Sequence, residues 1–468
     1  MHFDVIILGS GPGGYVASIR SSQLGLKTAI IEKNFIGGIS YNYGCVPIKF
    51  ILNKIKILQL IKKNPNLFGI NYDNFNIDYS KIILESNNII KKIKNNIFSL
   101  IKKNKIHVIY GKAKLKNRKT IEVIQNNNKN LEFYAKNIVI STGLTHNLKK
   151  NLYDGKRIIT YKEAFSLYNK NLKKIIIIGS DYIGIELACF YHFMGIKIII
   201  VESNPKIFSN GDYEISNYLN NYFKKIGINI YVSSSIISIN RTNNKTFVIL
   251  KVKENNNPIK LESDMVIYSD QMIPNTKFLG LEDIGIQTDN GYIVVNENYQ
   301  TNIPGYYAIG DVINTPPLAS VAMREAINCI EYIKGLYPQK IDYNNIPKCI
   351  LSYPEIASIG YTEEESIKNG YKVKISKYSF NSLNSKIITG TNSNGFIKII
   401  FDAKYDELLG CHIIGENVIN IISEIMIARK LETTAYEILN SIHPHPSLNE
   451  SISESISMIY GNNPIHYI

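Results

Sequence analysis

One pattern near the N-terminus limits the possible folds of this chain more than any other feature. Asp4–Leu8 is an apolar run of strand length, a helix rich in alanine and serine follows through Leu24, and Thr28–Ile31 is a second apolar run. The string GSGPGG joins the first strand to the helix, and Glu32 ends the second strand. A strand, a glycine turn, a helix and a strand ending in an acid predict a βαβ unit that binds a dinucleotide.

Each glycine of the turn has its own task in such a unit. Gly9 makes the tight turn, Gly11 lets the backbone approach a pyrophosphate, and Gly14 permits close packing of the helix. The Glu32 carboxylate is placed to accept hydrogen bonds from a ribose hydroxyl. We therefore expect one dinucleotide to bind at the N-terminal unit.

The pattern begins again 170 residues further along the chain. Its strands are Lys174–Ile178 and Lys197–Val201, with a helix through Met194 between them. The positions of Gly9, Gly14 and Glu32 are taken by Gly179, Gly184 and Glu202. Two such units predict two bound nucleotides, and Glu202 favours NAD over NADP because a carboxylate repels a 2′-phosphate.

The second unit departs from the pattern at one glycine. Asp181 stands where the first unit has Gly11. Its side chain takes up room there, and its carboxylate places negative charge beside the phosphates. We expect weakened NAD binding, by on the order of 1–3 kcal/mol.

Length and composition describe a globular protein of several domains. The chain of 468 residues is too long for one core, and 45% hydrophobic and 20% charged residues are typical of an ordered protein. The net charge of +14 comes from lysines spread along the chain, without an aromatic-studded basic groove or a nucleic-acid motif. We interpret this charge as solvating surface and expect no nucleic-acid partner.

The five cysteines are scattered, without a CxxC pair or a metal-ligand spacing. Such usage is typical of a reducing cytosol and predicts no metal site. The first strand begins at Asp4, and the longest apolar runs, such as Ile175–Ile178, are too short to span a membrane. We therefore expect a cytoplasmic protein without a secretory signal or membrane insertion.

Residues 37–50 read GGISYNYGCVPIKF, with a Gly-Gly pair, a Gly-Cys pair and a Pro-x-Lys string. This segment resembles the redox-disulfide segment of the flavoprotein disulfide reductases, in particular the dihydrolipoamide dehydrogenases. In that family two cysteines five positions apart form a disulfide beside the flavin. Cys45 occupies the second position, which faces the flavin, but Ser40 occupies the first. A serine hydroxyl cannot form a disulfide, so the resemblance implies impaired disulfide chemistry.

The resemblance extends in order over essentially the whole chain. The string ending in Thr142-Gly143 matches a strand-to-cofactor turn, and Pro304-Gly-Tyr-Tyr-Ala-Ile-Gly-Asp311 matches a second FAD motif. The resemblance implies FAD binding by Gly9, Gly11, Gly14, Glu32, Lys49, Ala113, Thr142, Gly143, Asp311 and Ala319. It implies NAD binding by Gly179, Gly184, Glu186 and Glu202, with Glu186 pairing with Lys49 beside the flavin.

A histidine motif lies near the C-terminus, in the string from His443 through His445 to Glu450. In the family such a histidine reaches across a two-fold interface to the disulfide of the other subunit, and the glutamate orients it. A carboxylate on one ring nitrogen fixes the imidazole tautomer, as expected of a general base for a thiol. The resemblance therefore makes Cys45, His445 and Glu450 the catalytic residues, and His443 is interpreted as shaping the turn.

Two further positions depart from the family pattern. A Gly-x-x-Pro-Asn turn beside the nicotinamide appears here as Gln271-Met-Ile-Pro274-Asn275, and Ser320 stands in for the usual histidine under the flavin. The missing glycine at Gln271 is a second reason to expect weakened NAD binding.

The predicted fold is α/β, with two tandem dinucleotide-binding (Rossmann-like) domains and a C-terminal α+β interface domain. The expected boundaries are 1–148 for the FAD domain, 149–270 for the inserted NAD domain, 271–340 for a returning central segment and 341–468 for the interface domain. Matches to the family's interface domain are Tyr353–Gly360, Phe380–Lys386 and Leu409–Gly415. Residues 51–104 are predicted as helices that cover the FAD domain.

The resemblance implies a homodimer that oxidises dihydrolipoamide on lipoyl-bearing subunits of a 2-oxo acid dehydrogenase complex, passing electrons through FAD to NAD. Two interpretations stay open. The chain is either an enzyme that is weak at lipoamide or works as a monothiol flavin NADH oxidoreductase, or it is an inactive FAD-bound structural subunit or decaying copy. An engineered serine would explain Ser40 but not Asp181 or Gln271. The other cysteines, Cys189, Cys329, Cys349 and Cys411, are interpreted as packing residues.

Overall fold

The computed structural model describes residues 1–63, 65–70, 77–117, 119–148, 152–165, 171–242, 245–253, 255, 257–269, 271–381 and 394–461. The chain forms two compact units. The first contains Met1–Phe50, Ser80–Lys149 and Gln271–Tyr343, and the second contains Ile51–Tyr79, Lys150–Asp270 and Asn344–Ile468. Each unit is thus built from segments that are far apart in the sequence.

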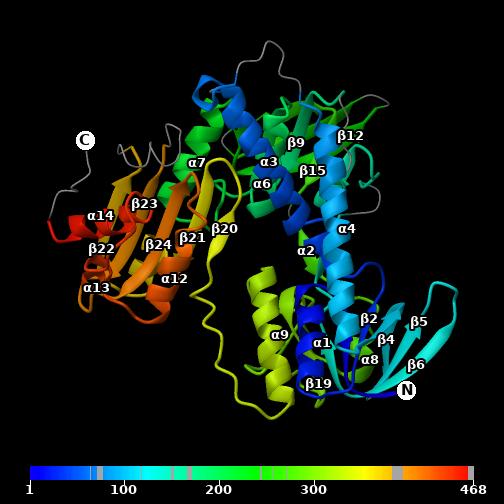
Figure 1. Cartoon of the computed structure of the whole chain (residues 1–468). Coiled ribbons are helices and arrows are strands. Elements are labelled where there is room, and N and C mark those ends of the chain that lie inside the picture. The colour runs from blue at the N-terminus through cyan, green and yellow to red at the C-terminus, as the bar shows by residue number, and fades with distance from the viewer. Residues whose placement is uncertain are drawn as a thin grey trace. The chain divides into compact units, whose positions relative to one another are not determined.

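A largely parallel sheet forms the centre of the first unit. Its parallel strands are β3 (His107–Tyr110), β2 (Thr28–Glu32), β1 (His2–Leu8), β6 (Asn130–Ile140) and β19 (Tyr306–Ala308), in that order. The antiparallel strands β5 (Thr120–Ile124) and β4 (Lys112–Asn117) continue from the long β6. Helices α1 (Pro12–Gln23) and α9 (Ala319–Ile333) pack against each other beside this sheet (Figure 1).

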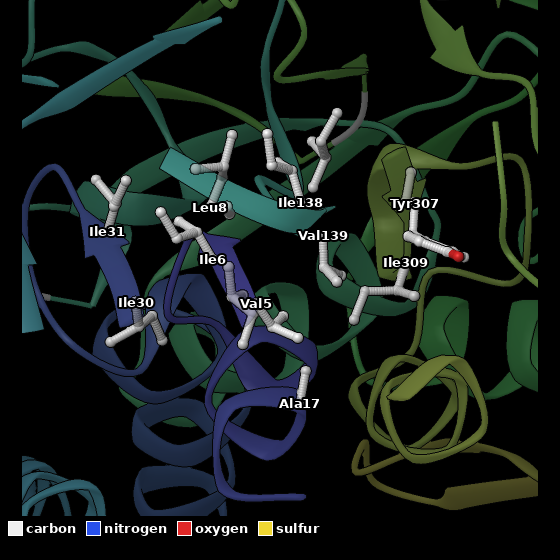
Figure 2. Close-up of a cluster of buried hydrophobic side chains, with 14 of the residues drawn as sticks. Val5, Ile6, Leu8, Ala17, Ile30, Ile31, Ile138, Val139, Tyr307 and Ile309 are labelled. Carbon is white, nitrogen blue, oxygen red and sulfur yellow. The ribbon is translucent and has the colours of Figure 1, made fainter. Parts of the chain in front are cut away.

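The core of this unit follows from apolar runs that are buried on both faces of the sheet. Val5, Ile6 and Leu8 of β1 are buried together with Ile138 and Val139 of β6 (Figure 2). Continuous apolar runs of this kind are typical of parallel strands, which are covered on both sides. Burial of these strands fixes the C-terminal ends of β1 and β2, where the dinucleotide turn and its acid lie.

The second unit contains another parallel sheet, with the order β11 (Asn229–Tyr231), β10 (Lys197–Val201), β9 (Lys174–Ile178), β15 (Met265–Tyr268) and β8 (Ile158–Thr160). Helix α6 (Tyr182–Phe193) connects β9 to β10, and α7 (Tyr213–Lys225) follows β10. An antiparallel meander is formed by β12 (Ser234–Arg241), β13 (Thr246–Val252) and β14 (Ile259–Ser263). The strand order matches that around β1 and β2, so the predicted tandem Rossmann-type architecture is confirmed.

The C-terminal part of the second unit is an antiparallel sheet covered by helices. Its order is β20 (Lys348–Ile350), β21 (Glu355–Gly360), β24 (Leu408–Gly415), β23 (Phe396–Asp402) and β22 (Val373–Ser379). The helices of this part, drawn in orange and red, are α12 (Ile422–Lys430), α13 (Ala435–Leu439) and α14 (Glu450–Ile459) (Figure 1). This arrangement confirms the predicted α+β interface domain. Of the predicted match Phe380–Lys386, residues 382–386 lie outside the described residues.

The helices predicted over residues 51–104 are α3 (Cys45–Lys63) and α4 (Tyr79–Lys103). The prediction that this whole stretch covers the FAD domain is wrong for Ile51–Tyr79, which belongs to the second unit. The physical reason is polar contacts on α3. Lys56 pairs with Glu355 at 2.7 Å, and Gln59 donates to the carbonyl of Phe193 at 2.9 Å.

Short elements complete the chain. They are α2 (Gly38–Asn42), η1 (Pro65–Phe68), β7 (Leu144–His146), α5 (Tyr161–Ala164), β16 (Met272–Pro274), α8 (Leu281–Ile284), β17 (Thr288–Asp289), β18 (Tyr292–Ile293), η2 (Gly310–Val312) and α10 (Glu363–Lys368). Among the residues that the structure describes, no helix has the length and apolar character needed to cross a membrane.

Candidate functional site

The first dinucleotide turn joins β1 to α1 and depends on glycine for steric reasons. Gly9 has φ +100°, and a Cβ atom there would lie 2.4 Å from the carbonyl oxygen of Ser141. A Cβ atom on Gly14 would lie 1.9 Å from the carbonyl oxygen of Gly9. Only glycine fits at either position, so the turn can bring backbone N–H groups up to a ligand.

The acid at the end of β2 is held by the same turn. Ser10 donates to one Glu32 carboxylate oxygen from its backbone N–H at 2.9 Å and from its hydroxyl at 2.6 Å. Asn34 donates its backbone N–H to the other oxygen at 2.8 Å. Glu32 is buried, and these bonds orient its carboxylate at the strand end where a ribose is expected.

The start of α1 leaves room for an anionic group. Gly11 is the N-cap residue and contributes no side-chain hydrogen bond, and a Cβ atom there would meet only Gly38, at 4.0 Å. Uncapped N–H groups and the positive end of the helix dipole suit a phosphate. The residues at this turn therefore fit the pyrophosphate of FAD.

The short helix η2, which contains Asp311, is a second segment expected at the FAD site. The backbone N–H of Gly310 donates to the carboxylate of Glu325 at 2.6 Å, and Glu325 is fully buried in α9. Burial, together with the neighbouring Glu325 carboxyl, raises the pKa of Asp311 to about 6. Glu325, which no sequence motif indicated, thus fixes the turn that presents Asp311.

The segment with Ser40 and Cys45 lies directly against the first dinucleotide turn. Gly37 donates its N–H to the carbonyl of Ser10 at 3.0 Å. A Cβ atom on Gly38 would lie 2.7 Å from Cα of Gly11, so the Gly-Gly pair allows two backbones to touch. Close packing of this kind brings the segment to the place where FAD is expected.

Within this segment, Ser40 lies in α2 and Cys45 is the first residue of α3. Cys45 lies at that helix start, as the sequence predicted, and its side chain is exposed. Lys49 lies four residues later and therefore on the same face of α3 as Cys45. Tyr41, next to Ser40, has its hydroxyl 3.1 Å from the hydroxyl of Tyr15 on α1, a contact that sequence reasoning missed.

The turn at Thr142 and Gly143 is joined to the returning chain. Thr142 donates its hydroxyl to the carbonyl of Asn275 at 2.9 Å, and the Asn275 amide donates to the carbonyl of Thr142 at 3.0 Å. Gln271, where a glycine was expected, has φ +61° and so holds a left-handed conformation that favours glycine. The remaining expected FAD residues are Ala113 in β4 and Ala319, the first residue of α9, with Ser320 next to it.

The second dinucleotide turn repeats the geometry of the first. Gly179 has φ +97°, and a Cβ atom on Gly184 would lie 2.3 Å from the Gly179 carbonyl oxygen. Ser180 donates to the Glu202 carboxylate from its N–H at 3.0 Å and from its hydroxyl at 2.5 Å, and Asn204 donates its backbone N–H at 2.8 Å. Ser180 and Asn204 correspond to Ser10 and Asn34, so the repeat includes the polar contacts around each acid.

The two turns differ at Asp181, the N-cap residue of α6. One of its carboxylate oxygens accepts the backbone N–H of Gly184 at 2.9 Å. Burial raises the pKa of Asp181 to about 6, against the opposing effect of this hydrogen bond. The Asp181 carboxylate therefore occupies the start of α6, whereas the start of α1 remains open.

Glu186, the other residue assigned to the NAD unit, is buried in α6, where one carboxylate oxygen accepts the backbone N–H of Leu351 at 2.9 Å. Lys49 is exposed on α3. Their pairing beside a flavin stays a prediction.

The histidine motif contains two imidazole–carboxylate pairs rather than one. Nδ1 of His445 lies 2.7 Å from Glu450, which also accepts the backbone N–H of Ser447 at 2.8 Å. Nε2 of His443 lies 2.7 Å from Glu424 of α12. The first pair was expected, but Glu424 is far away in the sequence and carries no motif that could have indicated it.

The other cysteines have surroundings unlike those of Cys45. Cys189, Cys329 and Cys411 are buried, whereas Cys349 in β20 is partly exposed. Burial raises the pKa of Cys189 to about 12 and also raises the pKa values of Cys329 and Cys411. Thiols with such raised pKa values are poor nucleophiles.

Known protein families match both the dinucleotide-binding part of the chain and its C-terminal part. The profile of the pyridine nucleotide-disulphide oxidoreductase family matches residues 3–326, and the profile of its dimerisation domain matches residues 346–456. The dihydrolipoyl dehydrogenase of Bacillus subtilis is 35% identical over 462 residues, with 97% of each chain covered. The dihydrolipoyl dehydrogenase of Zymomonas mobilis is 37% identical over 465 residues, with 98% of each chain covered.

Solved structures share the fold at lower sequence identity. LpdA from Mycobacterium tuberculosis superposes with a TM-score of 0.88 at 22% identity, covering 97% of this chain and 99% of that one. The HOCl-induced flavoprotein disulfide reductase of Escherichia coli, solved as a Cu(II) complex, gives a TM-score of 0.87 at 20% identity, with 98% and 99% covered. The chain therefore belongs to the pyridine nucleotide-disulphide oxidoreductase family and, within it, to the dihydrolipoyl dehydrogenases, which are FAD-dependent NAD oxidoreductases.

Proposed function

We propose that this protein is a dihydrolipoyl dehydrogenase-type flavoprotein whose disulfide half-reaction is impaired because Ser40 stands in place of the first redox cysteine. The observation that carries this proposal is the segment packed on the first dinucleotide turn, which presents one exposed thiol, Cys45, and one hydroxyl, Ser40. A dithiol cycle needs two thiols that close onto each other. A serine hydroxyl ionises too reluctantly to act as the second one.

The FAD site is proposed to be intact. The N-terminus of α1 would hold the pyrophosphate, Glu32 the adenosine ribose and Asp311 the ribityl chain, with Ala113, Thr142, Gly143 and Ala319 lining the rest. When bound, FAD supplies the two-electron relay between a thiol and a nicotinamide. Cys45 would lie at the start of α3 beside the flavin, and Lys49 would lie one turn further along the same face.

The His445–Glu450 pair is proposed as the proton acceptor for a substrate thiol. With the Glu450 carboxylate at Nδ1, that nitrogen would carry the proton and Nε2 would be the one to accept another, and the His445 side chain is exposed and so accessible to substrate. In this chain, however, the deprotonated substrate thiol would find no disulfide to attack. We therefore propose that lipoamide turnover is close to background while electron transfer from NADH to the flavin persists.

NAD binding is proposed to be retained but weak. Glu202, Gly179 and Gly184 keep the geometry of a dinucleotide turn, whereas the Asp181 carboxylate competes with the pyrophosphate for the N–H of Gly184. Gln271 has a positive φ that is strained for a residue other than glycine. It lies four residues before Asn275, which accepts the hydroxyl of Thr142. We propose that NADH is still preferred over NADPH because Glu202 repels a 2′-phosphate.

The wider assignment is also a proposal. It comprises an FAD domain (1–148), an inserted NAD domain (149–270), a central segment (271–340) and an interface domain (341–468) that forms a homodimer. The dimerisation-domain match supports the homodimer. We propose lipoyl-bearing subunits of a 2-oxo acid dehydrogenase complex as partners, in the cytoplasm.

A second candidate function is an inactive FAD-bound dimer that serves the complex structurally. It is favoured because the three residues that differ from the family pattern, Ser40, Asp181 and Gln271, all lie at positions of expected chemistry, in segments whose backbone geometry is kept.

Anaerobic titration of the purified protein with NADH, followed by flavin absorbance, separates the two candidates. The proposed enzyme should be yellow. NADH should bleach its flavin, but only at NADH concentrations well above those that would saturate a tight NADH site. A yellow protein whose flavin is never reduced would favour the structural subunit, and a colourless protein that takes up no FAD would contradict both.

A further inference from the structure

Glu424 lies in the first turn of α12 and contacts the His445 loop, residues 443–449, at both ends. Its Oε1 atom is 2.7 Å from Nε2 of His443, and its Oε2 atom accepts the side-chain amide of Asn449 at 2.5 Å. The two contacts use both carboxylate oxygens at once. They are charge-assisted, which makes them stronger than bonds between neutral groups.

The two contacted residues flank the imidazole–carboxylate pair of the proposed active site. His443 lies two residues before His445, and Asn449 lies immediately before Glu450. Asn449 is also the N-cap residue of α14, whose first residue is Glu450. A fixed Asn449 therefore fixes the position from which Glu450 reaches His445 at 2.7 Å.

The loop has little apolar burial of its own to hold it. Ile442, just before it, is 99% exposed, and the His445 side chain is 63% exposed. Leu448 is the buried apolar residue of the loop. A segment with so little buried surface depends on polar contacts for a single conformation.

The charges at the contact favour an ion pair. The Glu424 hydrogen bond raises the pKa of His443, and Glu450 acts in the same direction. Burial opposes ionisation of Glu424, but the bonds from His443 and Asn449 prevail and lower its pKa. The His443 side chain is 6% exposed and that of Glu424 is 36% exposed, so solvent screens this half-buried pair less than it would a fully exposed pair.

We propose that Glu424 is a positioning residue, which holds His445 and Glu450 in the geometry needed to take a proton from a thiol. The proposal rests on the assignment of His445 and Glu450 as the proton-accepting pair. Glu424 acts through His443 and Asn449 and does not itself touch the reacting atoms. His443 is then one of the two residues through which Glu424 acts, and not only a turn residue.

The first test measures His445 directly and does not need turnover. Diethyl pyrocarbonate modifies imidazoles, and mass spectrometry gives the rate at His445 for the natural chain and for the variants Glu424→Ala and Glu424→Gln. Glu424→Ala should change the rate several-fold because Glu450 no longer holds the ring, and Glu424→Gln should change it less, since an amide can still bond both partners. Glu432→Gln, which removes an exposed carboxylate just beyond α12, is the matched control and should have no effect.

The second test uses turnover in a Ser40→Cys background. Glu424→Ala should lower kcat for dihydrolipoamide roughly tenfold to a hundredfold, the cost of a misplaced catalytic group, with KM little changed. Reduction of a dye by NADH through the flavin should be unaffected, which excludes general damage. The kcat of Glu424→Gln should be closer than that of Glu424→Ala to the kcat of the Ser40→Cys parent.

Equal His445 labelling in Glu424→Ala and Glu432→Gln would overturn the proposal, and so would an unchanged kcat. If Ser40→Cys itself gives no lipoamide turnover, the proposed function fails, and the labelling alone then decides whether Glu424 positions His445.

Discussion

At the scale of single residues, the two dinucleotide turns form an internal comparison. Ser10 and Ser180 make the same contacts to Glu32 and Glu202. Gly9 and Gly179 share a positive φ, and a Cβ atom on Gly14 or Gly184 would meet the carbonyl oxygen of the glycine that starts its turn. The difference lies at one position, where a glycine that leaves the helix start open is replaced by Asp181, which closes it. A carboxylate held on the same molecule competes with a ligand phosphate at high effective concentration.

The first prediction concerns that competition. Asp181→Gly should tighten NADH binding by about 1–3 kcal/mol above neutral pH, through loss of repulsion and release of the Gly184 N–H. Asp181→Asn keeps the size of the side chain without its charge and should recover part of the gain. Calorimetric titration with NADH measures both, and equal affinities in all three proteins would mean that the turn already holds the carboxylate away from the nucleotide.

The same residue predicts a pH dependence. Because the pKa of Asp181 is raised to about 6, the carboxyl loses its charge as the pH falls through that value, and NADH should bind more tightly. The same raised pKa means that the contribution of Asp181 to folding stability falls as pH rises from its ordinary value of 3.8 through about 6. The affinity of Asp181→Asn should lack this dependence, and a parallel dependence in both proteins would assign it to another group.

At the scale of elements, the parallel strands and their turns could be predicted because their signals are local. Apolar runs such as Ile175–Ile178 and glycines at fixed spacing specify strand, turn and helix without reference to the rest of the chain. Contacts between distant segments could not be predicted. Glu424 meets His443 only because α12 and the loop before α14 fold together, and Ile51–Tyr79 joins the second unit through contacts such as Lys56 with Glu355.

One element-scale prediction tests the contact between the Gly37–Gly38 pair and the first turn. Gly38→Ala places a Cβ atom 2.7 Å from Cα of Gly11 and adds strain at φ +59°. It should cost roughly 1–3 kcal/mol and release FAD, because the segment can no longer lie on the turn. Retained flavin absorbance after gel filtration measures the release.

The control for this change is Gly25→Ala. Gly25 also has a positive φ, +78°, but a Cβ atom there meets nothing within 4 Å. The control should lower the thermal midpoint by strain alone and leave FAD bound. Loss of FAD in both variants would show that strain, and not contact with the turn, is responsible.

At the scale of the whole molecule, we propose that the base acts across a two-fold interface, so that activity would require the dimer. The C-terminal part of the second unit carries large apolar side chains that one chain leaves exposed, including Leu431 at 72%, Tyr436 at 65% and Ile442 at 99%. Exposed apolar residues gathered on one domain are typical of protein interfaces. The match to a dimerisation domain covers these residues.

We predict that Ile442→Glu weakens the homodimer. Burying a carboxylate in an apolar interface costs several kcal/mol unless it is paired, so sedimentation should show monomer at micromolar concentration. Phe278→Ser is the control, because Phe278 is 93% exposed in the first unit, outside the dimerisation domain. An Ile442→Glu protein that remains dimeric at high dilution would place the interface elsewhere.

The most direct test of the central claim is the rate at which dihydrolipoamide reduces NAD, measured for the natural chain and for Ser40→Cys, alone and with Asp181→Gly. We predict a rate close to background with Ser40 and measurable turnover with Ser40→Cys, because only the second protein can store a disulfide with Cys45. NADH-dependent dye reduction should be detectable in all of them. If the natural chain turned over lipoamide as fast as Ser40→Cys does, a second thiol would have to reach Cys45, and the account given for Ser40 would be contradicted.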